Sequence, residues 1–243
     1  MAAKVERRKG VWFVADTHLG LRMGDPVERE ERFVRFLKSV PRDSEALYML
    51  GDIWDFWYEY RDVIPKMGAR VIAELINLSD AGVGLFFAKG NHDMWIKDFF
   101  ESLGIRIIDQ PHFVNIHGKV FCLGHGDDLG KVPLGYRILL SVFRCRFARA
   151  LFSTIHPWIA YRFGYGWSNR NRRLHKPYHF KGEEEPLYRW ACGEKADFFI
   201  FGHFHDAVDL TLPSGARFVV LDDWMKGGMP NAYFDGETLR INA

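Results

Sequence analysis

Residues 11–18, VWFVADTH, begin with five apolar residues and end in Asp-Thr-His. The apolar part has the length and composition of a buried strand. The apolar runs 46–50 and 83–88 also read as strands, and each leads into polar residues. Between the three runs, apolar residues recur at helical spacing in 27–40 and 68–81. This alternation predicts βαβ units and a largely parallel central sheet.

The rest of the chain adds strands of a different arrangement. Segments 114–116 and 119–123 flank His117-Gly118 and predict a hairpin. Pro213-Ser214-Gly215 predicts a turn between two later strands. The later predicted strands are 197–201, 207–212, 218–222 and 232–234. We therefore expect two sheets packed together with helices outside.

Composition limits the class of protein. The 243 residues predict one domain, 1–243, with 48% hydrophobic and 26% charged residues, as in a soluble globular protein. A net charge of +2 gives no support for a nucleic-acid partner. Three cysteines without CxxC spacing favour a reducing compartment. The basic N-terminus lacks the apolar core of a signal peptide, and no uncharged run is long enough to span a bilayer. We expect a cytoplasmic location.

Residues from about 131 to 185 differ from the rest of the chain. No clear strand is visible there, and aromatic and basic residues are frequent. Apolar residues recur at helical spacing through 136–163, with arginines between them. We interpret this segment as a helical insertion that caps the main domain.

Each of five predicted strands ends in a polar cluster. Ligands of open α/β sheets bind beyond the carboxyl ends of the strands, so these clusters are expected to converge on one site. Neighbouring glycines allow sharp turns and close backbone approach. The clusters are Asp16-Thr17-His18, Gly51-Asp52, Gly90-Asn91-His92-Asp93, Gly124-His125-Gly126-Asp127-Asp128 and Gly202-His203-Phe204-His205.

The residue types in these clusters suit a divalent transition metal. Imidazole and carboxylate together favour manganese, iron or zinc over calcium, which takes oxygen ligands. In 16–18 and 203–205 the polar residues are two positions apart, so an extended backbone would direct them to one side. A single Asp or His in such a place is more often a turn residue. The five clusters in order, each after a strand, indicate a metal site.

As a set, these motifs resemble those of calcineurin-like metallophosphoesterases. The resemblance implies a four-layer αββα sandwich with two divalent metal ions. It implies that Asp52 bridges the two ions. The implied ligands are Asp16, His18, Asp52 and His205 for one metal, and Asp52, Asn91, His125 and His203 for the other.

The resemblance also implies a mechanism. Two adjacent cations clamp phosphoryl oxygens, acidify a bridging water and stabilise the leaving oxygen. His92 matches the catalytic histidine of the family, which binds the phosphate or protonates the leaving group, and Asp93 is expected to orient it. The alternative for His92 is a structural loop histidine.

Within the superfamily, serine/threonine phosphatases carry Arg-Gly where this chain has Phe56-Trp57 after Asp55, which disfavours that subgroup. A related DNA nuclease would need a basic DNA-binding face, and the even charge balance of this chain argues against that function. The sequence is more similar to UDP-2,3-diacylglucosamine hydrolases of lipid A biosynthesis. The similarity lies in residues 51–57, 125–128, 156–158 and 167–170, and in the insertion. It implies manganese-dependent hydrolysis of the pyrophosphate of UDP-2,3-diacylglucosamine to UMP and 2,3-diacylglucosamine 1-phosphate.

The insertion suits a lipid substrate. Two acyl chains need a long apolar groove, and arginines and lysines could rest on an anionic inner-membrane surface. The alternative is that its apolar residues form only a core of their own. The chain departs from the pattern of this family at His92, where the enterobacterial enzymes have Arg. The expected substrate contacts are Asp127, Trp167, Ser168, Asn169, Arg170 and Arg172.

Two other functions stay open at this point. A phosphodiesterase or nucleotide pyrophosphatase acting on a soluble substrate would use the same metal ligands. A non-enzymatic scaffold would keep the sandwich as a binding surface, but such a protein is expected to lose ligands, and this chain carries all seven.

Overall fold

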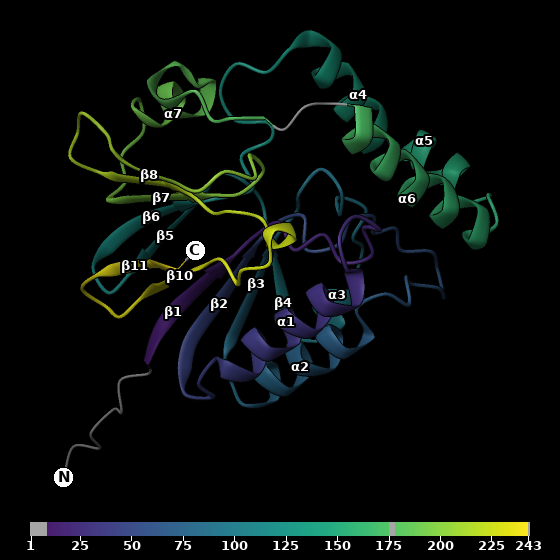
Figure 1. Ribbon diagram of the computed structural model, residues 1–243, viewed down its shortest axis with the longest axis horizontal. Helices are drawn as coiled ribbons and strands as arrows, with labels where there is room; N and C mark the ends of the chain where they lie inside the picture. Colours follow the sequence, from purple (N-terminus) through teal and green to yellow (C-terminus); the bar gives the residue numbers. More distant parts are fainter. Residues whose placement is uncertain (1–8, 175–177, 243) are drawn as a thin grey trace.

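The first of two sheets contains the strands that begin the chain. The computed structural model describes residues 9–174 and 178–242 (Figure 1). In this sheet β1 to β4 are parallel neighbours in chain order, and β10 and β11 extend it antiparallel beyond β1. The strands are β1 (Lys9–Val14), β2 (Ser44–Leu50), β3 (Gly84–Ala88), β4 (Ile105–Ile108), β10 (Asn231–Phe234) and β11 (Leu239–Asn242).

The second sheet has the order β5-β6-β7-β9-β8. Its three inner strands β6, β7 and β9 are parallel, whereas the edge strands β5 and β8 are antiparallel to their neighbours. The strands are β5 (His112–Ile116), β6 (Lys119–Leu123), β7 (Phe198–Phe201), β8 (Val208–Thr211) and β9 (Arg217–Val220).

Helices cover the outer faces of both sheets, so the molecule has four layers (Figure 1). Helices α1 (Pro26–Ser39), α2 (Ala69–Asp80) and α3 (Phe99–Ser102) lie against the first sheet, and α7 (Pro186–Ala191) lies against the second. Helix α1 begins where Asp25 accepts hydrogen bonds from the amides of Val27 and Glu28, with Pro26 as its first residue. Between the sheets is a core that includes stacked Phe13, Tyr48 and Phe121. The predicted αββα sandwich is confirmed.

The described residues of the predicted insertion form three α-helices, which lie beyond the carboxyl ends of the central strands (Figure 1). They are α4 (Leu134–Arg144), α5 (Arg146–Phe152) and α6 (Pro157–Leu174). The described residues also form two short 3-10 helices, η1 (Gly182–Glu184) and η2 (Trp224–Lys226). No helix in the described part of the chain is long and apolar enough to cross a membrane.

The predicted secondary structure was incomplete in two respects. Parallel pairing does not extend to every strand: β10 and β11 are antiparallel in the first sheet, and β5 and β8 are antiparallel edge strands of the second. In addition, β4, β11, α3 and α7 were not predicted. These elements have four to six residues, too few for a hydrophobic period to be visible.

Candidate metal centre

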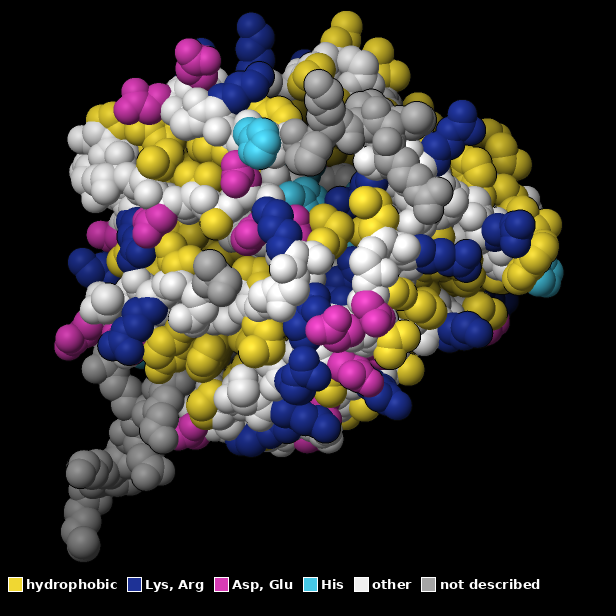
Figure 2. Space-filling model, viewed as in Figure 1, with side chains coloured by type: hydrophobic (Ala, Val, Ile, Leu, Met, Phe, Trp, Pro, Cys, Tyr) yellow, Lys and Arg dark blue, Asp and Glu magenta, His cyan; other side chains and the backbone are white. Residues whose placement is uncertain are grey.

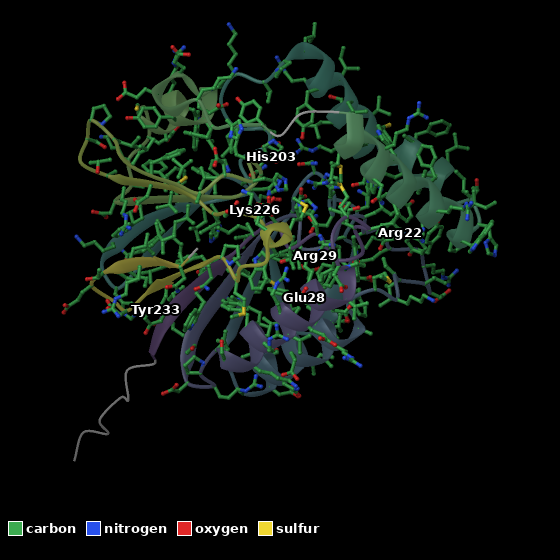
Figure 3. The ribbon with its side chains drawn as sticks, in the orientation of Figure 1. Arg22, Glu28, Arg29, His203, Lys226 and Tyr233 are labelled. Atoms are coloured by element: carbon green, nitrogen blue, oxygen red, sulfur yellow. The ribbon has the colours of Figure 1, made fainter. Side chains whose placement is uncertain are left out.

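The five polar clusters meet where β1, β2, β3, β6 and β7 end. His203, for example, lies at the end of the second sheet that faces the insertion (Figure 3). Five of the predicted ligands have left-handed backbones, which non-glycine residues rarely adopt. Such conformations cluster at functional sites, where the surrounding structure holds them. Their φ angles are 53° for Asp16, 48° for His18, 53° for Asp52, 75° for His203 and 56° for His205.

Close packing of the loops requires glycine at two positions. A Cβ atom on Gly90 would collide with Oδ1 of Asp52, and one on Gly202 would collide with Oδ2 of Asp16. The glycines therefore bring the backbone of one loop against the carboxylate of another.

One group of candidate ligands contains Asp16, His18 and His205. Oδ1 of Asp16 lies 3.5 Å from Nε2 of His18 and 3.7 Å from Nε2 of His205. That oxygen is buried and has no hydrogen-bond partner among the described residues. A buried carboxylate oxygen without a partner is costly unless a cation satisfies it. This donor set fits a divalent metal ion.

A second group lies beside the first. Nε2 of His125 is 3.4 Å from Oδ2 of Asp52 and 3.2 Å from Oδ1 of Asn91, and the same Asn91 oxygen is 3.1 Å from Nδ1 of His203. Oδ2 of Asp52 is also 3.7 Å from Nε2 of His18. Asp52 thus lies between the two groups, where a bridging ligand would lie.

Partners outside these groups orient three of the histidines. Nδ1 of His125 is 3.0 Å from the carbonyl oxygen of Leu50, and Nδ1 of His205 is 3.2 Å from Oδ2 of Asp223. Nδ1 of His18 is 3.3 Å from Oδ1 of Asp55. In each ring Nε2 is left to face the carboxylates, the usual arrangement of metal-binding histidines.

Burial sets the protonation states of several of these groups. It raises the pKa of Asp16 to about 6 and lowers that of His203 to about 4, and it holds the pKa of His18 well below its usual range. Near pH 7 Asp16 is therefore ionised and both imidazoles are neutral. These are the forms that coordinate a metal.

His92 presents one nitrogen to this centre. Its Nδ1 is 2.8 Å from the carbonyl oxygen of Asp55, and its Nε2 is 3.9 Å from Oδ2 of Asp52. Its backbone amide donates to Oδ1 of Asp52. The ring is partly exposed at the candidate centre, so it can reach a bound phosphate.

The hydrogen bonds of Asp93 place it between two loops, whereas its role in orienting His92 stays a prediction. Its carboxylate accepts from the backbone amides of Asp52 (3.2 Å), Ile53 (2.8 Å), Trp54 (3.3 Å) and Gly90 (2.8 Å). Asp93 therefore joins the loops after β2 and β3, and the carbonyl of Asp55 takes the place beside the His92 ring.

No role was predicted for Asp55, Gln110 or Asp223. Asp55 is fully buried, accepts a hydrogen bond from Oγ of Ser168 at 2.8 Å, and contacts His18. Oε1 of Gln110 accepts from the amide of His125 at 2.8 Å. Only Asp55 had a visible signal, as the second Asp of the GDIWD sequence. The other two lie outside the polar clusters.

The predicted substrate contacts lie in four different places. Nη2 of Arg172 is 3.0 Å from both ring nitrogens of His18, and Ser168 donates to Asp55, so both residues adjoin the centre. Asp127 is buried, and its carboxylate accepts hydrogen bonds from Nε2 of Gln110 and the hydroxyl of Tyr136. The other three line cavities: Trp167 lines the one beside His92, and Asn169 and Arg170 line another on the opposite side of α6.

An apolar cavity of about 420 Å³ opens beside His92. Helices α4, α5 and α6 form most of its wall, and Asn91, His92 and Asp55 lie at its polar end. Phe143 is typical of the wall, with its ring centroid 5.2 Å from that of Trp95 and 5.8 Å from that of Trp167. The apolar residues of the insertion therefore line a cavity that reaches the candidate centre.

Several known proteins are similar to this chain. A UDP-2,3-diacylglucosamine hydrolase from Porphyromonas gingivalis is 34% identical over 97% of this chain and 98% of its own length. Another, from Stenotrophomonas maltophilia, is 27% identical over 95% of this chain and 94% of its own. A solved structure of Yfce, a phosphoesterase from E. coli, aligns over 96% of this chain and 92% of its own with a TM-score of 0.47 and 16% identity.

Residues 10–207 match the calcineurin-like phosphoesterase family, which implies divalent metal ions. The matched range includes all five polar clusters and the candidate ligand groups described above. The chain belongs to the calcineurin-like phosphoesterase family and is a metal-dependent phosphoesterase.

Proposed function

We propose that this protein hydrolyses the pyrophosphate bond of UDP-2,3-diacylglucosamine to UMP and 2,3-diacylglucosamine 1-phosphate. The observation that supports this substrate most is the apolar cavity, whose polar end holds Asn91 and His92 beside the candidate metal groups. The Porphyromonas gingivalis relative, similar over nearly the full chain, is named for this substrate. A soluble phosphoester has no acyl chain that could fill an apolar cavity at this place.

The chain's own residues have distinct proposed roles. Asp16, His18, Asp52 and His205 would hold one divalent metal, and Asp52, Asn91, His125 and His203 the other. When bound, two such ions bind phosphoryl oxygens and make water a nucleophile near neutral pH. We propose manganese as the metal, on the donor set and the resemblance.

Around the metals, His92 hydrogen-bonds the phosphoryl group through Nε2, because its Nδ1 is held by the Asp55 carbonyl. Arg172 supplies positive charge to the diphosphate from α6. Ser168, which donates to Asp55, positions that carboxylate beside His18 and His92.

The cavity would bind acyl chain. Each methylene buried there contributes about 0.8 kcal/mol, so several methylenes supply much of the binding free energy. The sugar phosphate would then lie at the polar end and the pyrophosphate at the metals.

The insertion also offers a surface to a membrane. Its exposed apolar side chains include Ile138, Val142, Phe147, Leu151 and Trp158, which is 65% exposed. Figure 2 shows hydrophobic side chains alternating with Lys and Arg over the part of the surface where Figure 1 places these helices. Such a surface suits the interface of an anionic bilayer. We propose that the protein contacts the inner membrane through the insertion.

The test compares two substrates with manganese-loaded protein. UMP release from UDP-2,3-diacylglucosamine is expected to have a much larger kcat/KM than hydrolysis of bis-p-nitrophenyl phosphate. Robust diester cleavage without UMP release would reject the lipid nucleotide and leave a phosphodiesterase of soluble substrates.

The metal assignment is tested with Asp52→Asn. The proposed bridging position predicts that this variant loses both metals in elemental analysis and loses hydrolysis of both substrates. Asp43→Asn, in the loop before β2, is the control for the same chemical change. Full activity in Asp52→Asn would refute the bridge.

A further inference from the structure

A second cavity lies on the other side of α6 from the apolar one. Its volume is about 920 Å³, and it lies between α6 and residues 63–67, next to Arg22. Arg22 lies beside the insertion helices in Figure 3. Four of its lining residues are cations, and the lining includes no carboxylate; the cations are Arg22, Lys66, Arg162 and Arg170.

Within the described part of the chain, no ion pair balances the charge of this lining. Some arginines elsewhere on the surface are paired, as Arg42 is with Glu74 at 3.4 Å and Arg240 with Asp235 at 3.1 Å. Among residues 9–174 and 178–242, no carboxylate forms an ion pair with any of the four lining cations. Four unpaired cations around one cavity attract an anion.

Apolar and aromatic side chains form the rest of the lining. They include Val63, Ile64 and Tyr161. The guanidinium of Arg162 lies 5.7 Å from the centroid of the Trp158 ring, and Trp158 also belongs to the exposed apolar surface of the insertion. Cation and apolar surface thus adjoin at the mouth, an arrangement suited to an anion that carries an apolar group.

We propose that this cavity binds the phosphate headgroup of an anionic membrane phospholipid, whose acyl chains lie against the exposed apolar residues of α5 and α6. The continuity of the cavity with the surface around Trp158 and Ile159, both more than half exposed, favours a lipid over a free phosphate compound. The inference rests on the membrane contact proposed above, and it is independent of the hydrolysed substrate. The headgroup site would hold the enzyme on anionic regions of the bilayer.

The first test is binding of the full-length protein to vesicles of phosphatidylcholine, with or without phosphatidylglycerol. The double variant Arg22→Ala/Arg162→Ala is expected to bind the anionic vesicles about thirtyfold more weakly, about fivefold for each cation. The control Arg42→Ala/Arg240→Ala loses the same charge far from α6 and is expected to change binding by less than about twofold. Equal weakening in both double variants would reduce the effect to net charge and overturn the site.

The second test separates lipid from free phosphate by calorimetry with soluble dihexanoyl-phosphatidylglycerol and with UMP. The lipid is expected to bind saturably to wild type and not to Arg22→Ala/Arg162→Ala. Saturable binding of UMP that depends on these arginines, without lipid binding, would overturn the proposal in favour of a nucleotide site.

Failure of this inference and failure of the proposed function have different signatures. Hydrolysis of bis-p-nitrophenyl phosphate by the double variant, expected within about twofold of wild type, reports that the fold is intact. If the double variant hydrolyses UDP-2,3-diacylglucosamine in detergent as fast as wild type does, and wild type binds neutral and anionic vesicles equally, only the headgroup site is rejected. Selective binding of anionic lipid without hydrolysis of the lipid nucleotide rejects only the proposed substrate.

Discussion

Removal of one aromatic ring from the apolar cavity tests whether that cavity binds acyl chain. In Phe143→Ala the wall of the cavity loses its ring between Trp95 and Trp167. A fully buried phenylalanine side chain contributes about 1.5–3 kcal/mol, but the two tryptophans already cover part of this ring. About 1 kcal/mol is left for contact with a ligand, which corresponds to a roughly fivefold lower kcat/KM.

The assay measures kcat/KM of the manganese-loaded variant with UDP-2,3-diacylglucosamine and with bis-p-nitrophenyl phosphate. We expect the fivefold loss only with the acylated substrate, because the soluble diester does not reach the cavity. Phe113→Ala, a half-exposed phenylalanine on β5, is the matched control and should change neither value. An equal loss with both substrates, or no loss with either, would refute the assignment of the cavity.

Three further outcomes follow from the geometry. Gly90→Ala should lower metal content and activity, since its Cβ would collide with Asp52, whereas Gly135→Ala meets open space and should leave both unchanged. Asp93→Ala leaves backbone amides of two loops unsatisfied, so urea titration should show a loss of about 1–3 kcal/mol or more in unfolding free energy. Amide N–H groups of Ala148 and then Phe147 lower the pKa of exposed Cys145, whereas burial raises that of Cys122 to about 12. A lower pKa means more thiolate, so mass spectrometry after iodoacetamide treatment at pH 8 should find Cys145 labelled first and Cys122 last.

The ligand set was accessible from sequence because its signals are local. A short apolar run followed by Asp, Asn or His and by glycine describes both a strand and the turn at its end. The parallel strands then bring those turns to one edge, which is why Asp16, Asp52 and His125 could be grouped by their positions in the sequence. Asp93 shows the limit of this reasoning, because three of its four amide partners lie in the loop after β2, which no pattern around Asp93 indicates.

Sequence by itself determined the four-layer class, the polar clusters and the helical character of the insertion. Tertiary structure alone decided which partners hold the histidines, since Asp55 and Asp223 reach them through loop packing. It also divided the predicted substrate contacts. Successive residues of a helix point about 100° apart, so two positions turn by about 200°. Ser168 therefore lines the apolar cavity beside His92, whereas Arg170 lines the second cavity on the other side of α6. Local patterns specify what a segment becomes, and long-range packing specifies what its side chains meet.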